Sequence, residues 1–172
     1  GGSITTAATT PTGGQLDPAQ ITLTGNVELE AATITLASGG GDVTLSAKVD
    51  SDSGNNRALV INSGAGDVAI NGAIGTTDAL GNLSIDDGTG GATGAGNISL
   101  STVGADDTAG AAVMKIGNSN TAVLTLSGVD YHSGTSNQTY TAASIDITGA
   151  DATFTTACLL YTSDAADESV SG

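Results

Sequence analysis

The chain has 172 residues, of which 26 are glycine, and its formal net charge is −15 at pH 7. Only Lys48, Arg57 and Lys115 are basic. Three cations are too few to neutralise the phosphates of a nucleic acid, so we do not expect nucleic acid as a partner. Binding to an anionic membrane surface is disfavoured for the same reason. No apolar run approaches the roughly 20 residues that a membrane-crossing helix needs, so we do not expect the chain to span a membrane.

Residues 1–20 are rich in Thr and Gly and contain Pro11 and Pro18. We expect a low-complexity linker or an incomplete coil there. The first residue is Gly1 and the only methionine is Met114. We therefore expect a piece of a longer reading frame, for which the lack of a visible signal peptide says nothing about secretion.

A five-residue phrase, G-[DN]-[VI]-x-[LI], recurs from residue 25 onward. Its copies are Gly25–Leu29, Gly41–Leu45, Gly66–Ile70 and Gly96–Leu100, with a close variant at Gly81–Ile85. Each copy joins a pair of turn-forming residues to a short alternating strand, which predicts the same bend and the same inward-facing apolar pair each time. Repetition at intervals of a few tens of residues is typical of stacked repeat architectures.

After each copy, a polar loop leads to another apolar segment that we also expect to be a strand. Apolar residues do not recur at the spacing of a helix. A longer internal similarity is visible when the sequence is aligned with itself without gaps at an offset of 118 residues, so that Gln20 lies on Gln138. This alignment places Val27 on Ile145, and we interpret it as one full long repeat followed by the start of the next.

A single coil buries too few apolar side chains to offset the entropy of ordering its backbone, whereas stacked coils cover one another's apolar sides. We therefore predict an all-β fold, a parallel β-solenoid over residues 21–157. Val43, Val68 and Ile98 should share one interior column. A β-sandwich repeat, with antiparallel pairing, is the alternative.

The wording G-D-V-x-[LI]-x-G-A-[IV]-G, best seen in residues 66–85, resembles the strand repeats of filamentous-haemagglutinin-like adhesins and related large bacterial exoproteins. The stretch Gln138–Thr141 also resembles such arrays. The resemblance covers residues 21–154. It implies a right-handed β-helix shaft, two-partner or autotransporter-type secretion with an outer-membrane secretion partner, and an extracellular or bacterial cell-surface location.

The last segment differs in composition from the repeats. Cys158–Glu168 reads CLLYTSDAADE and resembles the in-frame translation of a transposase-type sequencing adapter. We expect residues 158–172 to be a non-native tail. Its side chains, including the only cysteine, should then carry no function.

Among the polar residues, none is predicted to be catalytic, cofactor-binding or metal-binding. His132 lies beside Asp130 and Ser133, but neighbours on a strand point to opposite faces, so we expect a solvated loop histidine. The pairs Asp86-Asp87 and Asp106-Asp107 are expected to be turn residues. Calcium at one of these loops is an alternative, because calcium prefers several oxygen ligands.

Glycine-rich and Asn-containing motifs also give no predicted site. The segments Gly39–Asp42 and Gly88–Asn97 faintly resemble the calcium-binding nonapeptide, without its tandem repetition. The stretch Gly88–Gly96 lacks the Lys of a phosphate-binding loop and is expected to be an inter-coil loop. The N-x-[ST] triplets at Asn82, Asn97 and Asn137 are interpreted as chance matches.

These observations favour a structural shaft segment of a large secreted bacterial surface protein or adhesin, without catalysis. Its ligand would be an unknown surface or glycan. One alternative is a fragment of a β-helix polysaccharide-active enzyme, which would need carboxylates clustered with Lys or Arg. Another is a calcium-stabilised surface-layer or matrix protein.

Overall fold

The computed structural model of the chain describes residues 2–5, 19–88, 96–105, 108–134 and 137–156; for residues 2–5 it describes the backbone alone. The described residues form a β-solenoid of about five turns, and about half of these described residues are in strands. The adapter-like segment, residues 158–172, and the pair Asp106-Asp107 lie outside the described residues.

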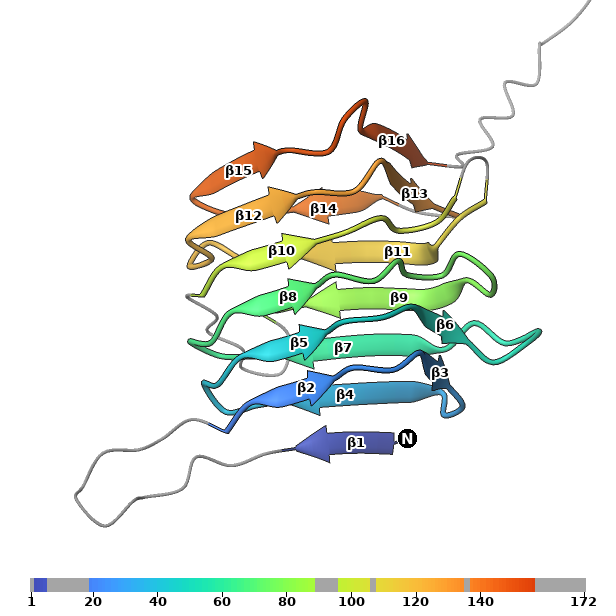
Figure 1. Cartoon of the computed structure of the whole chain (residues 1–172), viewed down its shortest axis with the longest axis horizontal. Coiled ribbons are helices and arrows are strands. Elements are labelled where there is room, and N and C mark those ends of the chain that lie inside the picture. Colours follow the sequence, from blue (N-terminus) through green and yellow to red (C-terminus); the bar gives the residue numbers. More distant parts are fainter. Residues whose placement is uncertain (1, 6–18, 89–95, 106–107, 135–136, 157–172) are drawn as a thin grey trace, which may run out of the picture.

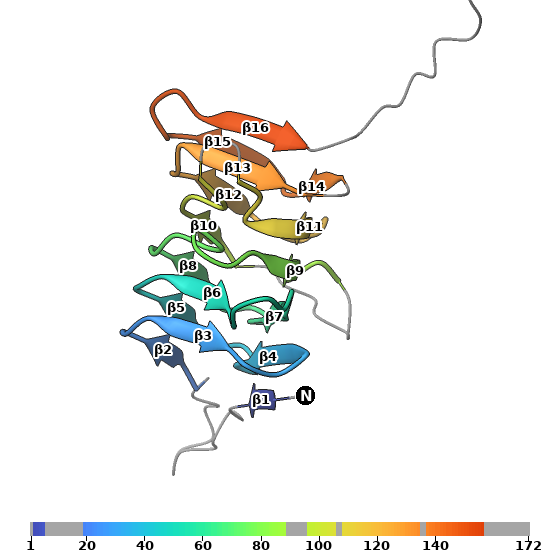
Figure 2. The ribbon, with the colours of Figure 1, turned by 90° about the vertical axis from the view of Figure 1, so that its right-hand side faces the viewer.

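The strands of successive coils form three faces of the solenoid (Figures 1 and 2), although two coils contribute only a single bridge to the second face. The first face consists of β2 (Ile21–Leu23), β5 (Val43–Leu45), β8 (Val68–Ile70), β10 (Ile98–Leu100), β12 (Val123–Leu126) and β15 (Ser144–Ile147). The second consists of β3 (Val27–Leu29), β6 (Val49–Ser51), β13 (Asp130–Ser133) and β16 (Thr153–Thr156). The third consists of β1 (Gly2–Thr5), β4 (Thr33–Ala37), β7 (Ala58–Asn62), β9 (Leu80–Ile85), β11 (Ala111–Ile116) and β14 (Gln138–Tyr140).

The strands of each face pair in parallel with the strands of the next coil, so the antiparallel β-sandwich alternative is wrong. In Figure 1 the chain climbs from β2 to β15 while its first-face strands run to the right and its third-face strands run back to the left behind them. The helix is therefore right-handed, as the sequence resemblance implied.

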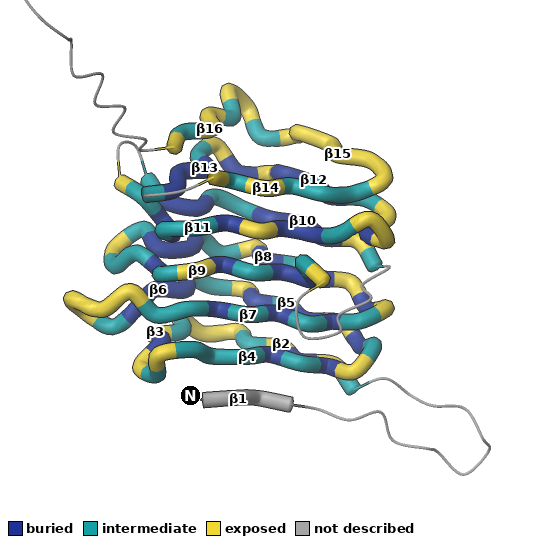
Figure 3. Tube along the Cα trace, turned by 180° about the vertical axis from the view of Figure 1, so that it is seen from behind, coloured by how far each residue is buried: buried dark blue, intermediate teal, exposed yellow. Residues whose placement is uncertain are grey.

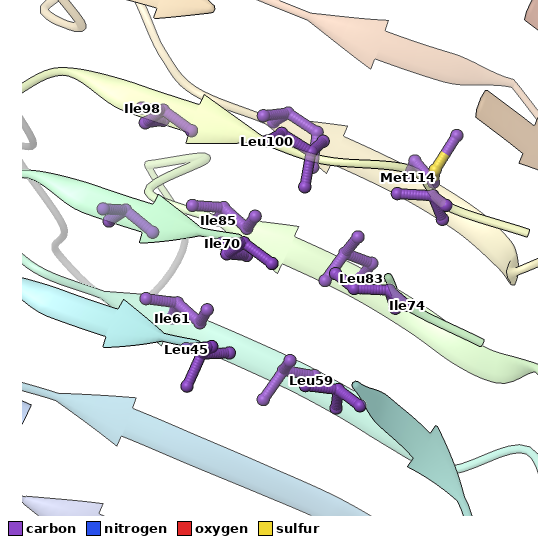
Figure 4. Packing of buried hydrophobic residues seen from close by; sticks show 14 of the residues in the cluster. Leu45, Leu59, Ile61, Ile70, Ile74, Leu83, Ile85, Ile98, Leu100 and Met114 are labelled. Atoms are coloured by element: carbon purple, nitrogen blue, oxygen red, sulfur yellow. The ribbon is translucent and has the colours of Figure 1, made fainter. Parts of the chain in front are cut away.

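Every strand places alternate side chains inside, so the stack builds continuous apolar columns. Val43 pairs with Val68, and Val68 pairs with Ile98, which confirms the predicted interior column. Each of the three is at most 2% exposed. Leu45, Ile70 and Leu100 form a second column beside it (Figure 4).

The second face is held by single bridges at two coils. Val49 pairs with Ile74, Ile74 with Val103, and Val103 with Tyr131, which in turn pairs with Phe154. The aromatic residues of the described coils gather at this end: the Tyr131 and Phe154 rings stack at 5.0 Å, and the Tyr140 ring meets both edge-on.

Not every copy of the recurring phrase has the same place in the coil. The copies at residues 41–45, 66–70 and 96–100 are equivalent first-face strands. The copy at Gly25–Leu29 instead forms β3 on the second face, and the variant at Gly81–Ile85 lies in β9 on the third. The expectation of one identical bend at every copy is wrong, because alternation alone does not specify which face a strand joins.

The alignment of the sequence with itself at an offset of 118 residues does not match structurally equivalent positions. It equates Val27 with Ile145, but Val27 belongs to the second-face column and Ile145 to the first-face column that contains Leu124. The equivalent of Gln138 is Ile34, through the third-face pairings, and not Gln20. Within residues 1–20, β1 pairs with β4 as a lone third-face strand.

Candidate functional site

The recurring Gly-[DN] pair forms a ladder along one corner of the solenoid. The Asp42 carboxylate accepts a hydrogen bond from the backbone N–H of Asp67 at 3.0 Å, 25 residues later. The Asp67 carboxylate accepts one from the backbone N–H of Asn97 at 2.7 Å, 30 residues later. These side chains therefore satisfy backbone donors of the next coil, which is why Asp or Asn follows the glycine in the phrase.

The glycine of the phrase is required by the close approach of successive corners. A Cβ at Gly66 would overlap the carbonyl group of Gly41, and a Cβ at Gly96 would overlap that of Gly66. The corner formed by Gly39–Asp42 is thus occupied by coil-to-coil contacts. Its resemblance to a calcium-binding nonapeptide follows from the same need for small and polar turn residues.

A second polar column lies inside the corner that follows the third face. Asp86 is 2% exposed and has a positive φ of 43°. Its carboxylate accepts hydrogen bonds from the backbone N–H of Ser63 at 2.8 Å and from the Ser63 hydroxyl at 2.5 Å. Its carbonyl oxygen accepts one from the Asn118 side chain at 2.5 Å. Burial raises the pKa of the Asp86 carboxyl, and the hydrogen bonds from Ser63 partly oppose this.

Asp86 is therefore a turn residue, which is the outcome expected for the pair Asp86-Asp87, and its contacts are with the chain's own coils. Ser38 occupies the equivalent corner one coil below Ser63 and donates to the Ser63 carbonyl oxygen at 3.2 Å. Spacing in the sequence did not reveal this column, because its members lie about one coil apart in loops of different length. Asp87 lies beside a recess in the surface of the third face.

That recess is a shallow groove of about 400 Å³ on the outer surface of the third face. The side chains lining it include Val60, Asn82, Asp87 and Lys115. The groove holds one exposed ammonium group, one carboxylate and an amide over an apolar floor, an arrangement suited to weak polar contacts. Asn82 thus faces a surface groove, whereas Asn97 belongs to the corner ladder described above.

A second recess, of about 330 Å³, lies beside β3 and β6, and its lining includes Glu28, Lys48, Asp50 and Thr77. The Lys48 ammonium lies 2.5 Å from the Asp50 carboxylate and donates to the Thr77 hydroxyl at 2.8 Å. Asp50 also accepts the backbone N–H of Thr77 at 3.2 Å. The sequence reasoning missed this group. Lys48 directly precedes β6 and Asp50 lies in it, and their spacing of two residues, which places both side chains on one side of an extended backbone, is the signal that indicates the group.

Arg57 has a carboxylate partner of its own. It makes a bidentate pair with Asp52, at 2.6 and 2.9 Å, across the loop between β6 and β7. The hydrogen bond from Arg57 lowers the pKa of the Asp52 carboxyl, and the same pairing raises the pKa of the guanidinium.

His132 is not the solvated loop histidine that the sequence predicted. It lies in β13, is only 5% exposed, and its backbone bonds to both Val103 and Gly110. Gly104 packs against it: a Cβ at Gly104 would lie 3.1 Å from the His132 Cβ. Ser133, next along the strand, is fully buried. Alternation along β13 places the His132 and Ser133 side chains on opposite sides of the strand.

The remaining sequence candidates add no further cluster. The described ranges contain no group of three or more His, Cys, Asp or Glu side chains arranged to hold a metal ion. Most of the stretch Gly88–Asn97 lies outside the described residues. Asn137 is exposed, immediately before β14. In the described part of the chain, no helix has the length and apolar character to cross a membrane.

Comparison with known proteins gives no assignment. We found no match to this chain among protein-family models, curated proteins or solved structures.

Proposed function

We propose that this chain is a structural shaft segment of a large secreted bacterial surface protein of the filamentous-haemagglutinin-like type, and that it works without catalysis or a cofactor. The supporting observation is the set of unbroken interior columns on all three faces. Such a stack should be stiff along its axis, and its length grows with the number of coils, since each coil contacts its neighbour through parallel strand pairing and apolar packing.

The outer surface supports a role in weak, multivalent contacts. The outward residues of the first face, in register along the stack, are Thr22, Thr44, Ala69, Ser99, Thr125 and Asp146. Four of these six side chains carry a hydroxyl group, and hydroxyls repeated at strand spacing offer similar hydrogen-bonding positions along the shaft. Their individual contributions would be small, and binding to a glycan or other surface would gain strength from their number.

The experiment compares cells that display the parent protein with cells from which its reading frame is deleted and with cells that carry a shaft shortened by one coil, residues 43–67. We expect the deletion strain to attach less to host or abiotic surfaces, and the shortened shaft to be secreted and displayed normally. Removing residues 43–55 instead, about half a coil, is the matched control. It should abolish display because it destroys the register.

Equal attachment by the deletion strain and the parent would exclude adhesion and leave only the shaft. Reducing sugar released from acidic polysaccharides by the purified chain would contradict the proposed absence of catalysis. Calorimetric titration with calcium should give no heat; a measured heat with a raised melting temperature would contradict the proposed independence from cofactors.

A further inference from the structure

The outer surface of the third face carries a groove that crosses successive coils. Figure 3 views this face from outside, with β4, β7, β9 and β11 lying one above another. The groove of about 400 Å³ described above lies over these strands. Its lining includes two rows of outward side chains that follow the strand register: Thr33, Ala58 and Asn82 in one row, and Val60, Ser84 and Lys115 in the other.

Two buried polar atoms on this face have no hydrogen-bond partner. They are the Ser84 Oγ and the Asn62 Oδ1, and among the described residues these are the two side-chain atoms in that condition. Ser84 lines the groove, and Asn62 follows Val60 by two residues, on the same outward side of β7. Because Val60 pairs with Ser84, the two atoms belong to neighbouring strands. An unsatisfied buried polar group costs about 1–3 kcal/mol, so two of them on one surface favour a ligand that supplies the hydrogen bonds.

The charges at the groove favour an uncharged ligand. Lys48 and Arg57 are paired with carboxylates, whereas the Lys115 ammonium makes no ion pair with the described residues. Asp87 lines the same groove, so one positive and one negative side chain contribute to it. The chain as a whole has a net charge of −15 and repels anions.

The ligand must be recognised through side chains, because the four strands have no free edge. Each is paired on both sides: β4 with β1 and β7, β7 with β4 and β9, β9 with β7 and β11, and β11 with β9, β13 and β14. A peptide that binds by adding a strand to a sheet therefore finds no backbone partner on this face.

A chain of sugar rings matches the groove in chemistry and in length. Sugar hydroxyl groups both donate and accept hydrogen bonds, as the Asn82 amide and the Ser84 hydroxyl do. The C–H faces of the rings can pack on the apolar side chains of Ala58 and Val60. Neighbouring strands lie about 4.8 Å apart, so the four strands span about 15 Å, the length of roughly three rings of an extended glycan.

We propose that the groove on the outer surface of the third face binds a neutral glycan chain that lies along the solenoid axis, across β4, β7, β9 and β11. Glycan hydroxyl groups bond to the Ser84 hydroxyl and the Asn82 amide, and the Lys115 ammonium donates to a glycan oxygen. This goes beyond the shaft proposal, because a shaft needs no ligand site. It also places a defined site on a different face from the repeated hydroxyl groups of the first face.

The test measures binding to the full purified chain by NMR, from shifts of the assigned backbone amide signals. The probes are neutral hexasaccharides of β-1,4-glucose, α-1,4-glucose, β-1,4-mannose and β-1,4-N-acetylglucosamine, with hexagalacturonate as the anionic comparison. Each is added to about 5 mM, which reaches weak affinities.

Ala58→Arg fills the groove with a long side chain. Ala69→Arg is the matched control, because Ala69 is also an outward, half-buried alanine within a strand, but on the first face. Circular dichroism checks folding, and Asn82→Arg, at an exposed position of β9, replaces Ala58→Arg if that variant fails to fold.

Ser84→Ala separates a binding role from a structural one. It removes a buried hydroxyl that has no partner in the chain, so the melting temperature should stay the same or rise. Affinity for the bound glycan should instead fall about three- to tenfold, as expected for one lost hydrogen bond. A lower melting temperature with unchanged affinity would show that the hydroxyl supports the fold and not the ligand.

We expect at least one neutral probe to shift amide signals of β7, β9 and β11 in the wild-type chain and in Ala69→Arg, and to shift none in Ala58→Arg. The absence of binding by every neutral probe would overturn the proposal. So would binding of hexagalacturonate alone, equal binding by Ala58→Arg, or shifts confined to the first face. None of these results would contradict the proposed shaft, which is tested separately by display of the shortened parent protein.

Discussion

The Asp67 carboxylate accepts a hydrogen bond from the backbone N–H of Asn97 at 2.7 Å, although 30 residues separate the two in the chain. Asp42 does the same for Asp67 one coil below. The phrases at residues 41–45 and 66–70 thus each place a carboxylate where it accepts a hydrogen bond from a backbone N–H of the following coil. The ladder fixes the height at which each new first-face strand begins.

Removing this acceptor should destabilise the solenoid modestly. Asp67→Ala leaves the Asn97 N–H to water at an exposed corner, so we expect a loss of about 0.5–1.5 kcal/mol in the free energy of unfolding. Asp67→Asn retains an acceptor and should lose less. Urea unfolding measures both, and Glu30→Ala controls for the loss of one negative charge. Equal stability of wild type and Asp67→Ala would show that the ladder contributes nothing.

The corner glycines should differ sharply in their tolerance of a methyl group. Gly96→Ala places a Cβ against the Gly66 carbonyl oxygen, and the backbone must shift to relieve the overlap. We expect a loss of more than about 2 kcal/mol, in the range of overpacking effects. Gly25→Ala is the matched control, because a Cβ added there would meet nothing within 4 Å. Its melting temperature should be unchanged or slightly higher, and similar losses at both positions would contradict the close stacking.

Asp86 should make the solenoid less stable as pH rises. Burial raises the pKa of this carboxyl above 3.8, so the folded state holds the proton more tightly than the unfolded state. Its contribution is most favourable below the unfolded pKa and is lost as pH rises through the raised folded pKa. Asp86→Asn, which tolerates the positive φ, should remove this slope. Unfolding free energies of both proteins across this pH range provide the measurement; parallel curves would contradict the assignment.

The Asp52 carboxyl should show the opposite sign. Its pKa is lowered by the hydrogen bond from Arg57, so its contribution is present above the unfolded value of 3.8 and is lost as pH falls through the folded pKa. The pair lies at the surface with both side chains about a quarter exposed, so salt should weaken it. In Arg57→Gln, NMR titration should return the Asp52 pKa toward its ordinary value. An unchanged titration would mean that the pair does not persist in solution.

The Tyr131 hydroxyl should stabilise the upper coils. It donates to the Leu100 carbonyl oxygen at 3.0 Å and accepts the Gly128 N–H at 2.8 Å, all in a buried position. Tyr131→Phe removes the acceptor of the buried Gly128 N–H, whereas the Leu100 carbonyl oxygen keeps the hydrogen bond from the Ser127 N–H at 3.0 Å, so we expect a cost of about 1–3 kcal/mol. Tyr140→Phe is the control, because its hydroxyl bonds only to the partly buried Gln138 side chain and should cost less. The order of the two melting temperatures decides the matter.

The sequence specified the first face well because its phrase combines three separate requirements. Glycine is needed where corners touch, Asp or Asn is needed to bond the next coil, and Val43 and Leu45 show the alternation of a half-buried strand. The pattern could not assign Val27 to its face, since successive corner residues are 22, 25 and 30 residues apart and loops of unequal length change the register.

The polar interior was less accessible to sequence reasoning. Ser63 and Asp86 meet only because a coil of particular length separates them, which no local motif indicates. His132 is buried where Gly104 packs against it and the Gly110 N–H bonds to its carbonyl oxygen, and the strand pattern carries no information about these neighbours. Side chains that depend on loop length are thus the ones whose environment the sequence did not reveal.

The central claim is that short strands of successive coils stack in parallel and in register. Methyl NOEs in the isotopically labelled chain test it most directly. The account predicts contacts from Val43 to Val68 and from Val68 to Ile98, with no direct contact from Val43 to Ile98. Strong Hα–Hα NOEs between these strands, as antiparallel pairing would give, or a missing contact between Val68 and Ile98, would contradict it.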